Sequence, residues 1–236
     1  MSTCVLEIKD LYKSFKMGNQ VVDILKNVSM KVNKGEFISI MGPSGSGKST
    51  LLYLMGGLDK ITSGAIAING NKLSSMNDST ESKMRRKDVG FIFQFYNLIP
   101  NLNVEENILL PVLLDGKKRK DYIKKVDQLL EIVGLSDRRH HTPRELSGGQ
   151  QQRTSIARAL INDPDIILAD EPIGNLDSKT GTGILELLRD INRTKNKTVI
   201  MVTHSKESTA YGNRIVNLKD GEICEDSSDL GGLCLA

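Results

Sequence analysis

The stretch at residues 36–55 limits the possible folds of this chain more than any other. Residues 36–41 are a short apolar run, residues 42–49 (GPSGSGKS) are a glycine-rich loop that fits G-x-x-x-x-G-K-[ST], and residues 50–55 are mostly apolar and of helical length. Strand, loop and helix in this order form a phosphate cradle, because glycines let backbone N–H groups turn toward one anion. The helix start adds its positive end. The stretch therefore predicts an α/β fold built around a phosphate site.

Two residues of the loop have distinct chemical roles in such a cradle. Lys48 is expected to reach the β- and γ-phosphates of a nucleotide, and the Ser49 hydroxyl to ligate Mg²⁺. A glycine-rich surface turn is the simpler alternative, but the predicted strand before the loop and helix after it favour the phosphate site. The residues expected to contact the nucleotide here are Gly42, Pro43, Ser44, Gly45, Ser46, Gly47, Lys48, Ser49 and Thr50.

Two adjacent carboxylates end a second apolar stretch. In IILADE, residues 166–171, apolar residues precede Asp170 and Glu171. Two such acids at the end of a buried strand repel each other unless a cation or substrate is nearby. Asp170 is therefore expected to hold Mg²⁺ through water, and Glu171 to act as general base toward the attacking water. Successive side chains of a strand point to opposite faces, which suits separate roles. A helix N-cap before Pro172 is the alternative.

Apolar periodicity predicts strands that alternate with helices, which favours a largely parallel central sheet. The expected strands are residues 5–9, 27–32, 36–41, 64–69, 89–94, 165–169, 198–203, 214–218 and 222–224. The expected helices are residues 50–55, 78–87, 104–114, 121–134, 150–161 and 178–194.

Consecutive helices between residues 97 and 161 indicate a helical sub-lobe inserted into the α/β core. Together these patterns predict one domain over residues 1–236, with an N-terminal antiparallel β subdomain. The glycine-rich end at about residues 226–236 shows no periodicity and is expected to be loosely ordered.

Composition narrows the class of protein. The chain has 236 residues, 39% of them hydrophobic and 26% charged, which fits one globular domain. A net charge of +3 is too small to indicate a nucleic-acid partner. No run of 18 apolar residues and no signal peptide are visible, so the chain is not expected to cross a bilayer. The three cysteines lack metal-site spacing, and they and the pair His140-His141 are not expected to bind a metal.

A further motif, LSGGQQQR at residues 146–153, leads to a resemblance. It stands with GPSGSGKST, IILADEP and VTHS in the order and spacing of the ATP-binding subunits of ABC transporters, and the likeness covers about residues 4–225. Other pieces, GEFISIMGPSGSGKSTLL, GFIFQFYNLIP, ENILLPVLL and GNLDSKTG, are most similar to the stand-alone ATPases of lipoprotein-release, macrolide-export and antimicrobial-peptide systems. The resemblance implies a P-loop NTPase with a RecA-like core that hydrolyses ATP with Mg²⁺.

The resemblance also implies roles for residues outside the phosphate loop. Phe15 matches the aromatic residue that stacks on adenine, although many members have tyrosine there. Gln94 matches the glutamine that senses Mg²⁺ and links to a membrane partner. Asp177 matches an acid of the dimer-contact loop, and His204 matches the histidine at the γ-phosphate.

In the family the working unit is a head-to-tail homodimer that holds two ATP molecules between its protomers. Ser147, Gly148 and Gly149 are expected to precede the helix at residues 150–161 and to offer backbone donors to a γ-phosphate. One chain already has a cradle, so this second anion-binding tip is expected to serve the neighbouring copy. The implied signature contacts are Ser147, Gly148, Gly149 and Gln150.

The resemblance further implies a separate integral-membrane permease, with this chain in the cytoplasm on the inner face of the cell membrane. The apolar segment at residues 91–114 is expected to form a groove for a permease helix, with a plain core helix as the alternative. The basic run at residues 117–120 is expected to be a solvated helix start. Export or extraction of a peptide, lipid-linked or hydrophobic cargo is implied. An ABC ATPase that signals or regulates cell-wall processes through a membrane complex is the alternative.

Overall fold

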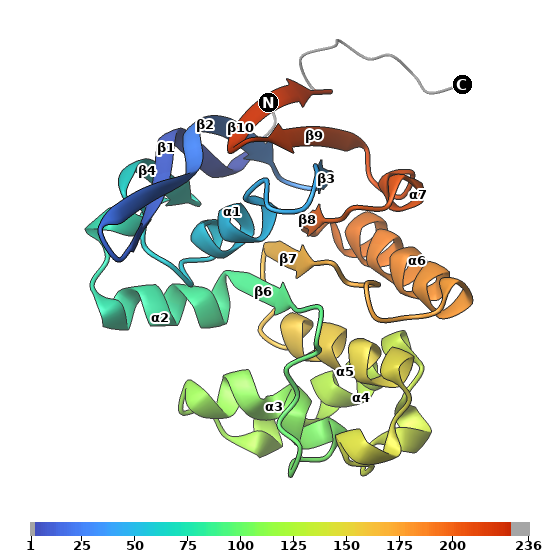
Figure 1. The fold of residues 1–236 in the computed structure, drawn as a ribbon. Helices are drawn as coiled ribbons and strands as arrows, with labels where there is room; N and C mark the ends of the chain where they lie inside the picture. The colour runs from blue at the N-terminus through green and yellow to red at the C-terminus, as the bar shows by residue number, and fades with distance from the viewer. Residues whose placement is uncertain (1–2, 228–236) are drawn as a thin grey trace.

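The computed structural model describes residues 3–227 and is built around a six-stranded sheet (Figure 1). The strand order is β10-β9-β3-β8-β7-β6, and all neighbours pair in parallel except β10, which runs antiparallel at one edge. This confirms the predicted parallel sheet. The strands are β3 (Phe37–Met41), β6 (Val89–Ile92), β7 (Ile166–Asp170), β8 (Thr198–Val202), β9 (Arg214–Lys219) and β10 (Glu222–Asp226).

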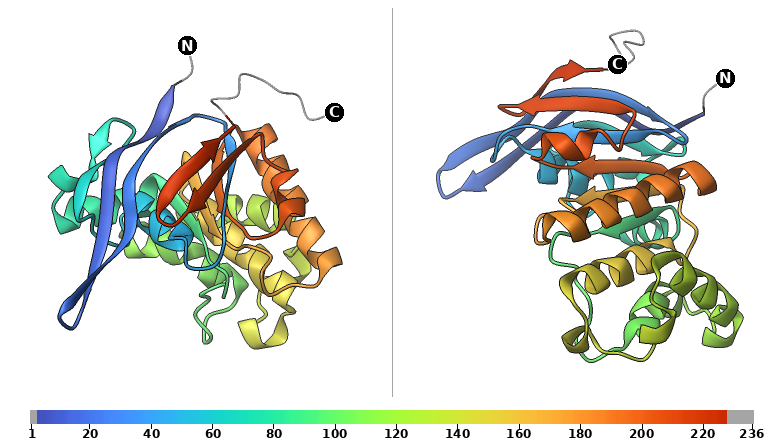
Figure 2. Two further views of the ribbon diagram at one scale, coloured as in Figure 1. Left: turned by 45° about the horizontal axis from the view of Figure 1, so that its top comes forward. Right: turned by 90° about the vertical axis from the view of Figure 1, so that its right-hand side faces the viewer.

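A second, antiparallel sheet is formed largely by the N-terminal part of the chain. Its order is β2-β1-β4-β5, and β1 and β2 form a long hairpin along one side of the molecule (Figure 2). The strands are β1 (Cys4–Met17), β2 (Gln20–Asn33), β4 (Ser63–Ile68) and β5 (Asn71–Lys72). The predicted N-terminal antiparallel subdomain is therefore present.

The helices form two groups. Helices α3, α4 and α5 lie together below the sheet in Figure 1, and the remaining helices accompany the two sheets. The helices are α1 (Lys48–Met55), α2 (Asp78–Lys87), α3 (Val104–Leu114), α4 (Ile123–Val133), α5 (Gly148–Leu160), α6 (Ser178–Lys195) and α7 (Lys206–Thr209). Short 3₁₀ helices lie at Leu73–Ser75, Arg119–Asp121, Ser136–Arg138 and Pro143–Glu145.

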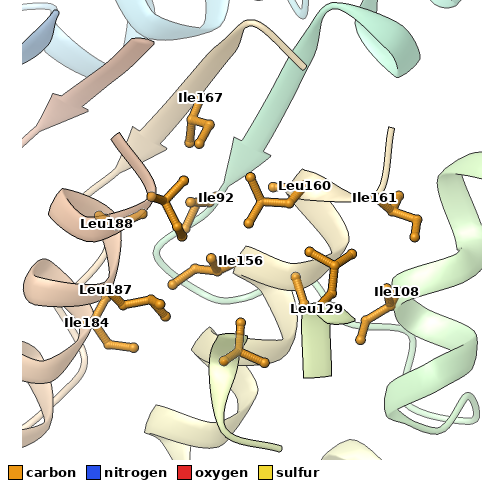
Figure 3. Close-up of a cluster of buried hydrophobic side chains, with 14 of the residues drawn as sticks. Ile92, Ile108, Leu129, Ile156, Leu160, Ile161, Ile167, Ile184, Leu187 and Leu188 are labelled. Atoms are coloured by element: carbon orange, nitrogen blue, oxygen red, sulfur yellow. The ribbon is translucent and has the colours of Figure 1, made fainter. Parts of the chain in front are cut away.

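Strand β7 contributes to both hydrophobic cores, which is why its sequence is continuously apolar. Ile167 and Ala169 pack with the helical group and α6, while Ile166 and Leu168 pack with α1 and the antiparallel sheet. Figure 3 shows the first of these cores, in which Ile156 and Leu160 of α5 lie near Ile167. Parallel strands buried on both faces show this pattern rather than alternation.

A buried ion-pair cluster fixes the start of α3. Glu105 is fully buried and accepts hydrogen bonds from Arg119 and Arg139, and Arg139 also pairs with Asp127 at 2.6 Å. Burial alone raises the pKa of Glu105, but the bonds from Arg139 and Arg119 outweigh it and keep the pKa below its usual value. The basic run at residues 117–120 was expected to be a solvated helix start, and Lys118, Arg119 and Lys120 are indeed exposed where a 3₁₀ helix begins. Arg119 in addition ties this start to the buried Glu105.

The β1–β2 hairpin is longer than the predicted strands at residues 5–9 and 27–32. Pairing continues outward to Met17 and Gln20, around Gly18, whose φ is 61°. The outer part mixes polar residues with exposed apolar ones such as Val21 and does not alternate regularly, so periodicity did not identify it. Cross-strand pairing supplies the stabilisation there.

Three other predicted elements have different boundaries in the structure. Helix α5 starts at Gly148 rather than at residue 150, so Gly148 and Gly149 lie inside its first turn. Strand β6 ends at Ile92, which leaves Gln94 in a loop. Strand β10 continues to Asp226, whose carboxylate pairs with Arg214 at 2.6 Å. The rest of the tail predicted at about residues 226–236 lies, from residue 228 on, outside the described residues.

Candidate active site

A cleft of about 410 Å³ lies where three parallel strands of the central sheet end. The loop at 42–49 follows β3, Glu171 follows β7, and His204 comes shortly after β8. Sites of open α/β sheets form at this edge, because neighbouring parallel strands bring their following loops together. The residues that line the cleft are Ile24, Ser44, Gly45, Gly47, Lys48, Ser49, Thr50, Glu171 and His204.

Two glycines of the loop are required by its geometry. Gly42 has a φ of 155°, and a Cβ there would lie 1.9 Å from the carbonyl oxygen of Leu218. Gly47 has a φ of 97°, and a Cβ there would lie 2.8 Å from Leu25. Any side chain at these positions would displace the loop from β9 or from the antiparallel sheet. The sequence predicted both glycines as part of a cradle, and their positions in the structure supply the steric reason.

Lys48 is the first residue of α1 and is largely buried. Its Nζ donates to the backbone oxygens of Gly42 at 2.9 Å and Pro43 at 2.7 Å. Burial lowers the pKa of the Lys48 ammonium, and the nearby carboxylates of Glu171 and Asp170 partly oppose this effect. Within the described part of the chain, no side chain caps the start of α1. The helix start and the ammonium therefore both present positive charge to the cleft.

Asp170 is held by hydroxyl groups of α1. Ser49 Oγ donates to Asp170 Oδ1 at 2.9 Å, and the Tyr53 hydroxyl donates to Oδ2 at 2.7 Å. The structure thus brings together the serine and the aspartate that the sequence singled out separately. Tyr53 was not predicted, although it lies four residues after Ser49 and so on the same helix face.

The Tyr53 hydroxyl provides a titration that can be followed directly. Burial, with the hydrogen bond to Asp170, raises the pKa of Tyr53 to about 12. Because this pKa exceeds the unfolded value, the contribution to stability is complete below about pH 10 and is lost as pH rises toward 12. Tyr53→Phe is expected to remove a late step from the tyrosinate absorbance titration. Tyr12→Phe, at an exposed position, is the matched control and keeps that step. A Tyr53→Phe titration identical to wild type contradicts the assignment.

Glu171 and His204 form a hydrogen-bonded pair, with 3.0 Å between Glu171 Oε2 and His204 Nδ1. Glu171 is not part of β7: its φ is 42°, and its backbone turns sharply after Asp170. Strand geometry therefore does not separate the two acids, contrary to the expectation from the sequence, and neither acid is the N-cap of a helix, since Asp177 caps α6. The separation of Asp170 from Glu171 comes from the turn, which directs Glu171 toward His204.

Gln94 also lies close to the turn at Glu171, in the loop that follows β6. Its backbone oxygen accepts a hydrogen bond from Asn175 Nδ2 at 2.9 Å. A Cβ at Gly174 would lie 2.9 Å from Gln94 Nε2 and 3.2 Å from Glu171 Oε2. The glycine therefore lets the Gln94 amide and the Glu171 carboxylate approach the same point. Neither Asn175 nor Gly174 was singled out from the sequence.

Phe15 lies on β1 with its side chain partly exposed. Lys13 Nζ lies 4.4 Å from the centre of its ring, a cation–π contact. Phe15 is not among the residues that line the 410 Å³ cleft, whereas Ile24 of the neighbouring strand β2 is. The ring is thus available on the antiparallel sheet, and Ile24 is an apolar cleft residue that the sequence did not identify.

The signature residues form the start of α5 and do not line the cleft. Ser147 and Gln150 make a reciprocal capping box, with Ser147 N donating to Gln150 Oε1 at 2.9 Å. A Cβ at Gly149 would lie 2.3 Å from Thr180 Cγ2, so this glycine allows α5 to pack against α6. Asp177 caps α6, and its hydrogen bonds from Thr180 hold its pKa below the usual value.

None of the helices between residues 3 and 227 has the length and apolarity needed to cross a membrane. Within the same part of the chain, no group of three or more His, Cys, Asp or Glu side chains converges as a metal site. Cys4 and Cys224 are free thiols, and Cys234 lies outside the described residues.

Comparisons with known proteins agree with this geometry. The chain is 46% identical to the macrolide export ATP-binding/permease protein MacB of Mannheimia succiniciproducens, over 94% of this chain and 34% of that protein. It is 41% identical to the lipoprotein-releasing system ATP-binding protein LolD 1 of Chlorobium chlorochromatii, over 96% and 93%. A solved dimer of the ATP-binding cassette MJ0796 of Methanocaldococcus jannaschii, bound to ADP and Pi, superposes with a TM-score of 0.86 at 44% identity, over 94% of this chain and 97% of that one.

The family model described as ABC transporter matches residues 25–174, which include the phosphate loop, the signature and the two acids. The match covers more than half of the chain, and the relatives align over nearly all of it. The chain therefore belongs to the ABC transporter family, as an ATP-binding subunit that has the P-loop NTPase fold and hydrolyses ATP.

Proposed function

We propose that ATP lies with its phosphates in the 410 Å³ cleft and that Glu171 activates the attacking water. The convergence of Lys48, Glu171 and His204 on one cleft is the observation that carries this proposal. Lys48 binds the β- and γ-phosphates, and backbone groups of residues 42–50 cradle them. Glu171 accepts the proton of the water, and His204, bonded to Glu171 at 3.0 Å, contacts the γ-phosphate. Phe15 stacks on the adenine ring.

The donor set also fits Mg²⁺, which prefers oxygen ligands. Ser49 Oγ and the Asp170 carboxylate already lie 2.9 Å apart, and both are hard oxygen donors. Ser49, Asp170 and the Gln94 side chain are the residues that would hold the ion. When bound, Mg²⁺ neutralises negative charge on the β- and γ-phosphates.

The catalytic unit in this proposal is a head-to-tail homodimer. Ser147, Gly148 and Gly149 form a helix start suited to a γ-phosphate, but they are not among the residues that line the cleft of their own chain. A second copy can supply this tip to the cleft. Gln150 supports it through the capping box, and Asp177 lies at the nearby start of α6, facing the dimer contact.

A separate surface suits the membrane partner. A groove of about 420 Å³ runs between α2 and β6 on one side and α3 and α5 on the other. It is mostly apolar, and Leu58 and Leu114 on its rim are strongly exposed. Phe93 also lines it and precedes Gln94, so an occupant of the groove lies beside the segment that reaches Glu171. A short helix of an integral-membrane permease fits this groove.

This assignment places the chain on the cytoplasmic side of a cell membrane, held there by the permease. Residues 1–236 then act as one ATPase domain with the helical sub-lobe at about 97–161. Macrolide export and lipoprotein release appear in the names of two relatives. They support export or extraction of a peptide, lipid-linked or hydrophobic cargo.

Co-purification with the permease and a cargo-stimulated ATPase assay test this function. Leu114→Asp is expected to reduce binding of the permease about tenfold or more, because a carboxylate on the apolar rim must be desolvated. Leu113→Asp is the matched control, because Leu113 is also exposed on α3 but does not line the groove. Equal loss in both variants contradicts the groove assignment. A purified complex that responds to no cargo contradicts transport.

A further inference from the structure

A glutamine of the signature helix touches the turn that carries Glu171. Gln152 of α5 is fully buried, and its Nε2 donates to the backbone oxygen of Pro172 at 2.6 Å. Pro172 directly follows Glu171 in the chain. The bond therefore joins α5 to the peptide next to the general base, within one protomer.

The turn at Glu171 needs such support. Its φ of 42° is unfavourable for a residue with a Cβ, and it persists only where the surroundings hold it. Within the described residues, Glu171 N donates to the oxygen of Val202 and Gly174 N donates to the oxygen of Glu171, each at 3.0 Å. The bond from Gln152 holds a third peptide group of this turn, the one that contains the Pro172 carbonyl.

Packing alone does not favour an amide at this position. Gln152 Oε1 is buried and has no hydrogen-bond partner among residues 3–227. An unpaired buried acceptor is destabilising, and a methionine of similar length would fill the same space without it. The interaction that the amide provides, and that methionine would lack, is the bond to Pro172.

Gln152 also lies in the same helix as the phosphate-binding tip. Ser147 caps α5, and Gly148 and Gly149 form its first turn, so Gln152 is little more than one turn further along. A short helix moves as a rigid element, so a displacement of the tip moves Gln152 with it. The tip and the turn of Glu171 are thus connected through one side chain.

We propose that Gln152 is a positioning residue that couples the two ATP sites of the dimer. This inference rests on the proposed head-to-tail arrangement, in which the tip of α5 binds the γ-phosphate held by the partner. When that phosphate is bound, α5 is fixed, Gln152 holds Pro172, and Glu171 is set for the ATP in its own cleft. Each site therefore hydrolyses ATP faster when the other contains ATP.

Gln152→Met tests the coupling without removing volume. Turnover is expected to fall about 10- to 100-fold, because small misplacement of a catalytic group has effects of this size. The Hill coefficient for ATP is expected to fall from about 2 toward 1, while the ATP affinity of the monomer and the melting temperature do not decrease. Gln128→Met is the matched control, since Gln128 is exposed on α4, away from the turn. Wild-type turnover and Hill coefficient in Gln152→Met overturn the proposal.

Gln152→Glu gives a readout that a packing role does not predict. A buried carboxyl group has a raised pKa, and only its protonated form has an O–H that can donate to Pro172. The turnover of Gln152→Glu relative to wild type is therefore expected to rise as pH falls from about 8 to about 6. A ratio independent of pH, or one that falls, overturns the role of the donated bond.

A dimerisation measurement separates this inference from the proposed function. Glu171→Gln and the double variant Glu171→Gln/Gln152→Met are compared for ATP-dependent dimers by light scattering. If neither forms a dimer, the head-to-tail arrangement fails and the coupling fails with it. If both form dimers while Gln152→Met alone hydrolyses ATP with wild-type turnover and cooperativity, the arrangement stands and only the role of Gln152 is rejected.

Discussion

Glu171→Gln is expected to lower the turnover number by about 10²- to 10⁴-fold, the usual contribution of a general base. A neutral amide cannot accept the proton of the attacking water. It has the shape of the carboxylate, and its oxygen can still bond to His204, so the cleft should keep its geometry. ATP affinity should therefore remain near that of wild type. In the proposed dimer the γ-phosphate bridges the two protomers, so its hydrolysis is expected to separate them. Because Glu171→Gln blocks hydrolysis, the ATP-bound dimer should accumulate. Phosphate release and size-exclusion chromatography with light scattering measure the two effects.

The control for this variant is Glu186→Gln, which makes the same chemical change at an exposed position of α6. It is expected to hydrolyse ATP like wild type and to form no stable dimer. Near-normal turnover in Glu171→Gln removes Glu171 from the role of base. Slow turnover of Glu171→Gln without an ATP-dependent dimer supports Glu171 as the general base but contradicts the head-to-tail homodimer.

The sequence predicted those parts of the fold that depend on local patterns. The helices expected at residues 78–87 and 104–114 have these bounds in the structure. The first is a polar stretch and the second an apolar one, and each follows a capping asparagine, Asn77 or Asn103. The β1–β2 hairpin was only half predicted, because its outer part is stabilised by a partner strand and carries no apolar alternation. Pairing across a sheet is a non-local property that a window of sequence does not contain.

The backbone turn at Glu171 could not be predicted from the local sequence for a different reason. The two acids after the predicted strand at residues 165–169 were expected to have strand geometry, and a residue before proline is normally driven to extended conformations. The observed φ of 42° depends on hydrogen bonds from Glu171 N to Val202 and from Gln152 to Pro172. These contacts come from distant segments, so local preference was overruled by the tertiary structure.

The residues of the candidate site likewise fall into those that local sequence patterns predicted and those that depend on tertiary contacts. The loop that contains Lys48 was predicted because one continuous motif specifies it, and the acids were found because they end an apolar stretch. Tyr53, Gln152 and Asn175 were missed because their importance lies in what they touch across the fold. Helical spacing from Ser49 offered a signal for Tyr53. Gln152 and Asn175 lie within the motifs LSGGQQQR and GNLDSKTG, but no local feature indicated what their side chains bind.

Ser147→Arg is expected to lower turnover by about 10²- to 10³-fold, the range for losing a preorganised donor to the transferring group. Arginine removes the capping bond between Ser147 Oγ and Gln150 N and places a long cation at the tip of α5. Since Ser147 does not line the cleft of its own chain, monomeric Ser147→Arg should bind ATP like wild type. Calorimetry on the monomer and a steady-state assay measure the two quantities. Ser136→Arg, at an exposed position, is the control and should be active.

Mixing Ser147→Arg with Lys48→Ala decides whether the tip acts within one chain or across the dimer. Each variant alone has two defective sites. In a head-to-tail heterodimer one site combines the intact Lys48 loop of one protomer with the intact tip of the other, while both defects fall in the second site. Turnover of the mixture is therefore expected to exceed that of either variant alone. It stays below about a quarter of the wild-type value, the limit for random pairing of independent sites, because coupling through Gln152 slows the intact site when the second site is defective. If the tip served its own chain, every site in the mixture would remain defective and no activity would return. Loss of ATP binding by monomeric Ser147→Arg would likewise place the tip at its own cleft.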